Sequence, residues 1–253
     1  MTSLRYDGSP SGFLCLLGTA IKQHLAVNEI RRGKQPATGD LFAEELLIEC
    51  DRVWAARVAA GLERKLGKRF LTQLGQALLS EEDGIEWDLL ELTRRALKQG
   101  PDLLDQLADP LVNRVDRAAL RTSRERHRLL GLLRFERLID DIYLARIIPK
   151  TNVVPLLGNH FAKRLGDQRW LIVDDKRRIG VWGENRRWEL TEQVELSSDL
   201  RRHEKETQIA DLWRRFYHSI GNPDRHNPKL RQQFMPKRYW AYLTELGDSE
   251  GSG

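Results

Sequence analysis

The spacing of apolar residues changes near residue 132, and this change constrains the fold more than any other feature of the sequence. Before it, apolar side chains recur every three or four residues, which is the spacing of a buried helix face. After it, short apolar runs are separated by charged or glycine-containing turns, as in strands. We therefore predict an α+β fold with a mainly helical region over 1–132, a basic α+β region over 133–246 that can be continuous with it, and a disordered tail over 247–253.

The first region contains several helix signals. Ser9 or Ser11 can cap a helix that begins near Phe13, and Asp51 can cap a later one. Apolar residues keep helical spacing through most of the remaining sequence up to residue 132. The other segments are a loop over 31–40, a candidate strand over 44–50, and helices over about 53–66, 69–79, 86–98 and 111–132.

The second region alternates strands and turns around one short helix. That helix contains Gly158 and ends before Gly166. The order of the segments predicts an antiparallel β-β-α-β-β-β unit followed by two closing helices. The predicted strands cover 134–137, 142–148, 170–173, 179–182 and 188–190, the internal helix covers 153–165, and the closing helices cover about 200–219 and 236–246.

Tryptophans in these elements are expected to pack inside the protein. Trp170, Trp182 and Trp188 lie in predicted strands, where a position in the core or on a sheet face is the ordinary one. Trp213 begins an apolar series with helical spacing, which also favours the core.

Charge is distributed unevenly along the chain, whose net charge is +5. Residues 1–120 hold 16 basic and 18 acidic residues, whereas residues 121–190 hold 16 basic and 9 acidic ones. Residues 201–240 add 10 basic residues against 4 acidic ones. Because lysine and arginine attract phosphates, this surplus indicates a polyanionic partner for the second half. The helical first half, which is slightly acidic, is expected to face a protein partner.

The most distinctive short segment is residues 227–240, which sets basic and amide side chains between prolines and ends on an adjacent Tyr–Trp pair. Lysine and arginine can neutralise phosphates, and flat aromatic rings can stack on bases. The same segment can equally be a basic loop fixed to the core by its aromatic rings. We expect Phe234 and Met235 to anchor it and Tyr239 or Trp240 to stack on a base. Its cationic candidates are Lys229, Arg231, Lys237 and Arg238.

Arginine pairs occupy both turns of the predicted three-stranded unit, Arg177-Arg178 in one and Arg186-Arg187 in the other. If the turns lie along one rim, the four guanidinium groups can follow a phosphate backbone. Exposed charge at a hairpin turn is also the ordinary surface pattern. The predicted nucleic-acid-binding set is completed by two arginines of the β-rich region, Arg134 and Arg146.

A histidine and two carboxylates are the candidates for hydrolytic chemistry. His160 lies in the short helix, and Asp174 and Asp175 follow the next strand. A histidine beside a carboxylate can act as a general base, although a histidine within an apolar helix is more often a packed residue. No spacing typical of a metal site, a nucleotide-binding loop or a nucleophile elbow is present, so we expect no metal or nucleotide cofactor in this chain.

Cysteine usage and hydropathy limit the remaining possibilities. Cys15 and Cys50 both lie among apolar residues, so buried free thiols are expected. Two thiols are too few for a four-thiolate iron–sulfur cluster. The apolar run over 13–17 is much shorter than a membrane span, and no signal peptide is recognisable, so we expect a soluble cytoplasmic protein.

Seven stretches form a recognisable set, namely residues 6–14, 127–135, 143–147, 152–157, 160–162, 174–178 and 227–240. As a set they resemble the prokaryotic "probable DNA metabolism protein" family, and the resemblance runs from Tyr6 to about Glu245. Members of that family accompany a radical-SAM protein thought to repair or modify DNA, and some are fused to a uracil-DNA-glycosylase-like domain. The sequence shows no such extension, so glycosylase activity is not expected.

The resemblance implies DNA as the substrate class and a radical-SAM protein as the partner. The iron–sulfur cluster and S-adenosylmethionine would then be bound by that partner. Our leading hypothesis is an accessory DNA-binding subunit in DNA repair or modification. Two alternatives stay open: a nucleic-acid hydrolase that uses His160 with Asp174 or Asp175, and a protein-interaction scaffold with a basic surface.

Overall fold

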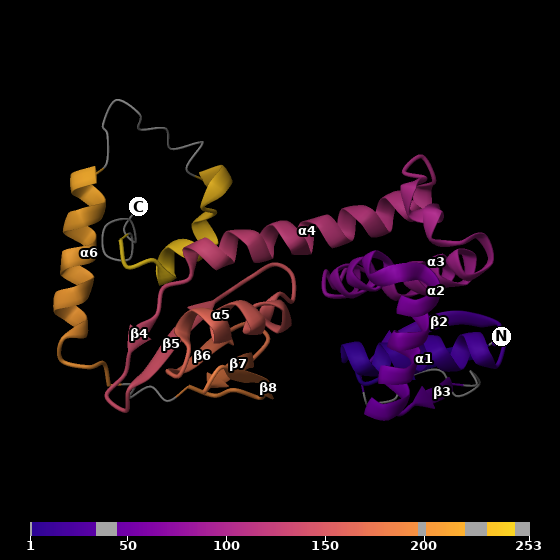
Figure 1. Ribbon diagram of the computed structural model, residues 1–253, viewed down its shortest axis with the longest axis horizontal. Coiled ribbons are helices and arrows are strands. Elements are labelled where there is room, and N and C mark those ends of the chain that lie inside the picture. Colours follow the sequence, from indigo (N-terminus) through magenta and orange to yellow (C-terminus); the bar gives the residue numbers. More distant parts are fainter. Residues whose placement is uncertain (1, 34–44, 197–200, 221–231, 246–253) are drawn as a thin grey trace. The chain divides into compact units, whose positions relative to one another are not determined.

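The computed structural model describes residues 2–33, 45–196, 201–220 and 232–245, without the side chains of residues 216–220. The chain divides into two compact units, 1–123 and 124–253. This division falls within helix α4 (Pro110–Leu132) and not at the change of apolar spacing near residue 132. Figure 1 shows the elements of each unit, coloured along the sequence.

The first unit is mainly helical, as predicted, but it also contains a three-stranded parallel sheet in the order β2-β1-β3. Helix α1 connects β1 to β2, because parallel neighbours need a crossover connection. β1 and β2 mix charged and apolar residues without regular alternation, so only pairing within the sheet makes them strands. The elements are β1 (Thr2–Tyr6), α1 (Pro10–Lys22), β2 (Val27–Arg32) and β3 (Glu45–Ile48).

The helix caps expected in the first unit are present. The Ser9 hydroxyl accepts a hydrogen bond from the backbone N–H of Gly12, and the Asp51 carboxylate caps the next long helix. Gly67, with φ of 84°, interrupts that helix between the two predicted helical segments. The later elements of this unit are α2 (Arg52–Leu78), α3 (Ile85–Gln99), the 3-10 helix η1 (Pro101–Asp105) and the first part of α4.

Two expectations for the first unit need correction. Cys15 is a buried free thiol, as expected, but Cys50 is exposed because it lies in the connection between β3 and α2. The loop predicted over 31–40 starts later than expected, because β2 extends through Arg32. Residues 34–44 lie outside the described part of the chain.

The second unit contains a five-stranded sheet in the order β4-β5-β6-β7-β8. The predicted order of strands and helix is confirmed, but the prediction of a wholly antiparallel unit is wrong at one pair. β5 and β6 run parallel, because the chain between them crosses over through η2 and α5. The elements are β4 (Glu136–Arg137), β5 (Ile142–Ile147), η2 (Val154–Leu156), α5 (Gly158–Leu165), β6 (Arg169–Asp174), β7 (Ile179–Glu184) and β8 (Arg187–Glu192).

One face of this sheet carries the core of the second unit. Helix α5 packs on β7 and β8 and lies across the sheet in Figure 1. Trp170 is fully buried, as predicted, and packs with Phe161 of α5. The same core includes Leu129 from the end of α4 and Tyr239 and Leu243 from the closing segment. Residues distant in sequence therefore meet on one side of the sheet.

The closing elements α6 (Glu206–Ile220) and the 3-10 helix η4 (Lys237–Tyr242) are shorter than the predicted helices over 200–219 and 236–246. Trp213 of α6 is 38% exposed, so its predicted core position is wrong. The tail over 247–253 lies outside the described residues. Within the part of the chain that the structure describes, no helix is both long and apolar enough to cross a lipid bilayer.

Candidate nucleic-acid interface

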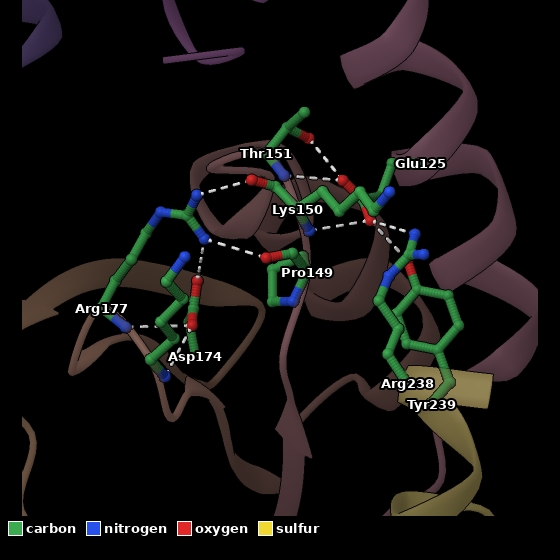
Figure 2. Close-up of polar contacts among 9 residues, drawn as sticks. Glu125, Pro149, Lys150, Thr151, Asp174, Arg177, Arg238 and Tyr239 are labelled. Atoms are coloured by element: carbon green, nitrogen blue, oxygen red, sulfur yellow. Dashed lines mark hydrogen bonds and ion pairs between the residues drawn. The ribbon is translucent and has the colours of Figure 1, made fainter. Parts of the chain in front are cut away.

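The turn after β5 is held by a buried carboxylate. The side chain of Glu125, in α4, is 2% exposed and faces this turn in Figure 2. Its oxygens accept hydrogen bonds from the backbone N–H of Lys150 at 3.0 Å and from the backbone N–H and hydroxyl of Thr151 at 2.7 and 2.8 Å. The closing segment adds the Arg238 guanidinium at 2.7 Å and the Tyr239 hydroxyl at 2.6 Å. One carboxylate thus joins three segments that are distant in sequence.

These partners keep Glu125 charged. Burial alone would raise the pKa of Glu125, because a carboxylate is poorly solvated inside a protein. Hydrogen bonds from Tyr239, Lys150 and Thr151 outweigh burial and lower the pKa to about 2. Burial and the adjacent Glu125 carboxylate in turn raise the pKa of Tyr239 well above its usual value. At neutral pH the pair is therefore an ionised acceptor and a protonated donor.

A second buried carboxylate fixes the other side of the same turn. Asp174, at the end of β6, is fully buried and accepts a hydrogen bond from Nη1 of Arg177 at 2.8 Å. Arg177 also donates to the carbonyl oxygens of Pro149 at 3.2 Å and Lys150 at 2.8 Å. Figure 2 shows the turn held between Glu125 on its N–H side and Arg177 on its carbonyl side.

Asp175 forms the third pair at this end of the sheet. It accepts hydrogen bonds from Nε of Arg146 at 3.0 Å and from the Tyr242 hydroxyl at 2.7 Å. Burial and the Asp175 carboxylate raise the pKa of Tyr242 to about 12. Each carboxylate of the network is therefore matched by one arginine: Glu125 by Arg238, Asp174 by Arg177, and Asp175 by Arg146.

Three exposed cations lie on the turns that this network holds, and we call Lys150, Lys176 and Arg178 the basic rim. Lys150 belongs to the turn after β5, and the other two belong to the turn between β6 and β7. The ammonium groups of Lys150 and Lys176 form no ion pair within the described residues. The side chain of Arg178 is 70% exposed and pairs with Glu195 at 3.5 Å. The rim therefore presents positive charge that the network does not cancel.

The closing segment is largely structural where it is described. Tyr239 is 2% exposed and cannot stack on a base in this position, and Arg238 is engaged with Glu125. Met235 packs against the core, as predicted, but Phe234 is 64% exposed, so its predicted anchoring role is wrong. The backbone turns between these two neighbours, which leaves only Met235 against the core.

The remaining members of the segment have mixed positions. Trp240 is half-buried, and its Nε1 donates to the carbonyl oxygen of Met235 at 2.8 Å. Lys237 is exposed, with its Nζ 5.8 Å from the centre of the Trp240 ring. Lys229 and Arg231 lie outside the described residues. Lys237 is thus the described cation of this segment that remains accessible to a phosphate.

Arg134 is also committed internally. It forms an ion pair at 2.7 Å with Glu245, whose side chain is almost fully buried. The indole Nε1 of Trp213 donates to the same carboxylate at 2.9 Å, and the Arg134 guanidinium lies 5.3 Å from the Trp213 ring centre. Arg134 therefore joins the closing segment to the rest of the unit.

The predicted rim of four hairpin arginines is wrong. β6, β7 and β8 form an antiparallel meander, so successive turns lie at opposite ends of β7. A six-residue strand spans roughly 17 Å between its first and last residues. The turn that bears Arg178 is therefore separated by this length from the turn that bears Arg186 and Arg187. Arg186 is exposed and pairs with Asp167 at 3.4 Å, while the Arg187 side chain forms no ion pair within the residues described.

The structure does not bring His160 together with the carboxylates. Its ring stacks edge-on against Phe161 at 5.0 Å between centroids, and its buried Nε2 has no hydrogen-bond partner within the described structure. Burial, with Arg164 and Arg126 nearby, lowers the pKa of His160. Asp174 and Asp175 are occupied by arginines instead.

Several residues at this end of the sheet escape sequence reasoning. Glu125 lies in the basic stretch over 124–128, where a solvated helix face is the ordinary interpretation. The one signal in the sequence that could have identified Glu125 is that it is a single acidic residue among arginines. Lys150 lies in none of the recognisable stretches, and Lys176 lies in the stretch over 174–178, where only the neighbouring aspartates and arginines are predicted site residues. Among the described residues, no group of three or more His, Cys, Asp or Glu side chains is arranged to hold a metal ion.

Comparison with known proteins gives one family match. The model of a domain of unknown function, DUF4130, matches residues 84–245, which include the whole network of Figure 2. No curated protein and no solved structure matches the chain.

Proposed function

We propose that the chain, which belongs to the DUF4130 family, is an accessory DNA-binding protein that acts in DNA repair or modification. The basic rim is the observation that carries this proposal. Its cations are exposed, and the carboxylates beside them are already paired with arginines of the protein. A phosphate approaching Lys150 or Lys176 thus meets little opposing negative charge. Cations in such a position bind phosphates chiefly by releasing condensed counterions.

The network also makes the rim rigid. Glu125 and Arg177 bind the two sides of the turn after β5, and Asp174 accepts two backbone N–H groups of the next turn. A turn that is already fixed loses less conformational entropy when it binds. The three carboxylate–arginine pairs therefore support DNA binding by fixing the turns.

A radical-SAM protein is the partner that we propose. This part rests on the resemblance of the sequence to the "probable DNA metabolism protein" family. The two cysteines of this chain are too few to hold a four-thiolate cluster, so the iron–sulfur cluster and S-adenosylmethionine would be bound by the partner. DNA held on the rim would be presented to that protein.

The hydrolase alternative has less support from the geometry. It requires His160 to activate water beside Asp174 or Asp175. Both carboxylates accept hydrogen bonds from arginines, and within the described structure no hydrogen bond joins either of them to His160. The scaffold alternative shares the basic rim and differs in its partner, so the DNA-binding experiment separates it from our proposal.

The test is the salt dependence of DNA affinity in rim variants. Lys150→Ala and Lys176→Ala should each weaken binding to a duplex and reduce the slope of log affinity against log salt by about 0.9 per lost phosphate contact. Lys163→Ala is the matched control, because Lys163 is an exposed lysine of α5 outside the rim. Affinity and slope should stay unchanged in this control.

Two results would contradict the proposal. One is duplex affinity that does not change with salt, and the other is an equal loss in the rim variants and in the Lys163→Ala control. Retention of the radical-SAM partner on the immobilised chain after nuclease treatment, with no DNA affinity for the isolated chain, would favour the scaffold alternative.

A further inference from the structure

Trp182 differs from the other tryptophans of the β-meander. Trp170 is fully buried, and Trp188 donates its indole N–H to the side-chain oxygen of Asn159 at 2.9 Å and packs against Gly158. Trp182 is only partly buried, and its side chain forms no hydrogen bond or ring contact with any described residue. Among the tryptophans of this meander, Trp182 is therefore the one whose ring can contact a ligand.

Trp182 lines a groove at the β7–β8 hairpin. The groove has a volume of about 590 Å³, and its lining is Trp182, Glu184, Asn185, Arg187, Trp188 and Glu189. Side chains alternate along a strand, so Trp182 and Glu184 lie on the sheet face opposite to the one that carries Val181 and the core. Strand pairing places Glu189 directly across from Trp182 and Arg187 directly across from Glu184.

The polar side chains of the groove are also uncommitted. Glu184, Arg187 and Glu189 form no side-chain hydrogen bond or ion pair within the described residues, although strand pairing sets opposite charges side by side. Elsewhere in this unit, buried carboxylates are each matched by an arginine. The groove thus combines a partly exposed aromatic ring with hydrogen-bond acceptors, an amide and one cation.

We propose that this groove binds an unpaired nucleobase that carries an exocyclic amino group, as cytosine and adenine do. The base stacks on Trp182, its amino group donates to the carboxylate of Glu189, and Arg187 contacts an adjacent phosphate. Every base has a flat face that stacks on an aromatic ring, and a carboxylate accepts well from the cytosine amino group. This inference rests on the proposed function, which it extends by naming single-stranded DNA as the form bound.

The groove holds two carboxylates, Glu184 and Glu189, and one cation, Arg187, so its net charge does not select a nucleotide. The choice of a nucleobase over a basic peptide rests on position: Arg187 offers a partner for a phosphate, and the basic rim adjoins the start of the same strand. Arg178 of the basic rim precedes Trp182 by four residues, which is roughly 13 Å along β7. A single strand can therefore contact both the rim and the groove.

The experiment measures affinity for oligonucleotides of one base and for a duplex. Thymine lacks the amino group, so wild-type protein should bind oligo-dC and oligo-dA more tightly than oligo-dT. Trp182→Ala should weaken binding to oligo-dC by about ten- to a hundredfold, with duplex affinity changed less than about twofold. Trp182→Phe keeps a stacking ring and should retain most of the affinity. Glu189→Gln should narrow the difference between oligo-dC and oligo-dT, because an amide can also donate to thymine.

Trp87→Ala is the matched control, since Trp87 is an exposed tryptophan of the first unit, and it should leave all affinities unchanged. Unchanged oligo-dC binding by Trp182→Ala would overturn the inference, as would an equal loss on single strands and duplex. The inference would also be overturned if Trp182→Ala lost binding to a lysine-rich peptide but kept its binding to oligonucleotides. Failure of the rim variants to change duplex binding, with Trp182-dependent oligonucleotide binding intact, would refute the rim and leave this groove supported.

Discussion

Polar side chains at the two ends of strand β7 have opposite surroundings. We call the start of β7, with the carboxylate network of Glu125, Asp174 and Asp175, the closed end, and the β7–β8 hairpin the open end. At the start of β7, Asp174 is fully buried and its oxygens are taken up by Arg177 and by backbone N–H groups. At the end of β7, the side chains of Glu184 and Arg187 stay open to solvent and form no bonds with other described residues. The comparison suggests two roles for polar side chains. Those that are hydrogen-bonded within the protein stabilise the fold, and those without a partner in the protein are available to a ligand.

A similar distinction applies to eight basic residues among the twelve predicted to contact nucleic acid. Arg134, Arg146, Arg177 and Arg238 each pair closely with a carboxylate that is itself mostly buried, and they act as structural cations. Arg178 and Arg186 form only long pairs with exposed carboxylates, and Arg187 and Lys237 are exposed without an ion pair among the described residues. A basic residue is thus a poor indicator of DNA contact until its internal partners are known.

The largest effect is expected when the closed end loses its central carboxylate. Glu125→Ala removes the acceptor of five hydrogen bonds, so Arg238 loses its carboxylate and two backbone N–H groups lose their acceptor. Breaking a buried pair in this way typically lowers the free energy of unfolding by about 3–5 kcal/mol. Urea denaturation followed by tryptophan fluorescence measures the change.

Glu189→Ala is the control for that comparison, because it removes a carboxylate from the open end of β7. Its effect on the free energy of unfolding should be below about 0.5 kcal/mol. Similar losses in the two variants would show that the distinction between the ends is wrong.

Acid should weaken the closed end selectively. The pKa of Glu125 is about 2 in the folded protein against 4.5 ordinarily, so the folded state binds fewer protons than the unfolded chain in this range. The stabilisation is complete above about pH 4.5 and is lost as the pH falls towards 2, with a size on the order of 3 kcal/mol. Unfolding free energies measured from pH 6 to pH 2 should fall steeply for the wild type and more gently for Glu125→Gln. Parallel profiles would rule out Glu125 as the source.

Sequence reasoning recovered the features that depend on local pattern and missed those set by tertiary partners. The β6–β8 meander followed from its charged turns, and the Ser9 and Asp51 caps followed from residue type. β1 was missed because its strand conformation depends on parallel neighbours on both sides. No local rule could pair Glu125 with Tyr239, since 114 positions separate them.

A smaller effect is expected from one hydrogen bond at the closed end, the one between Tyr242 and Asp175. Tyr242→Phe removes the donor to Asp175 but keeps the ring beside Arg146. The free energy of unfolding should fall by about 1 kcal/mol, the usual contribution of such a bond. Tyr143→Phe is the matched control, because the Tyr143 hydroxyl has no hydrogen-bond partner within the described residues. An equal loss in the control would mean that packing, and not the bond to Asp175, is responsible.

The smallest effect is expected at the open end, where a substitution should raise the free energy of unfolding and not lower it. Asn185 and Arg186 form a two-residue hairpin turn with φ of 51° and 62°, a conformation in which glycine is strongly preferred at the second position. The Arg186 side chain is 76% exposed and its pair with Asp167 is also exposed, so the ion pair offsets little of this strain. Arg186→Gly should therefore raise the free energy of unfolding by roughly 0.5 kcal/mol. Arg187→Gly makes the same chemical change within strand β8, where glycine is unfavourable, and should lower it. Thermal unfolding of both variants measures the contrast, and a loss of stability in Arg186→Gly would mean that the exposed arginine holds this turn through contacts of its own.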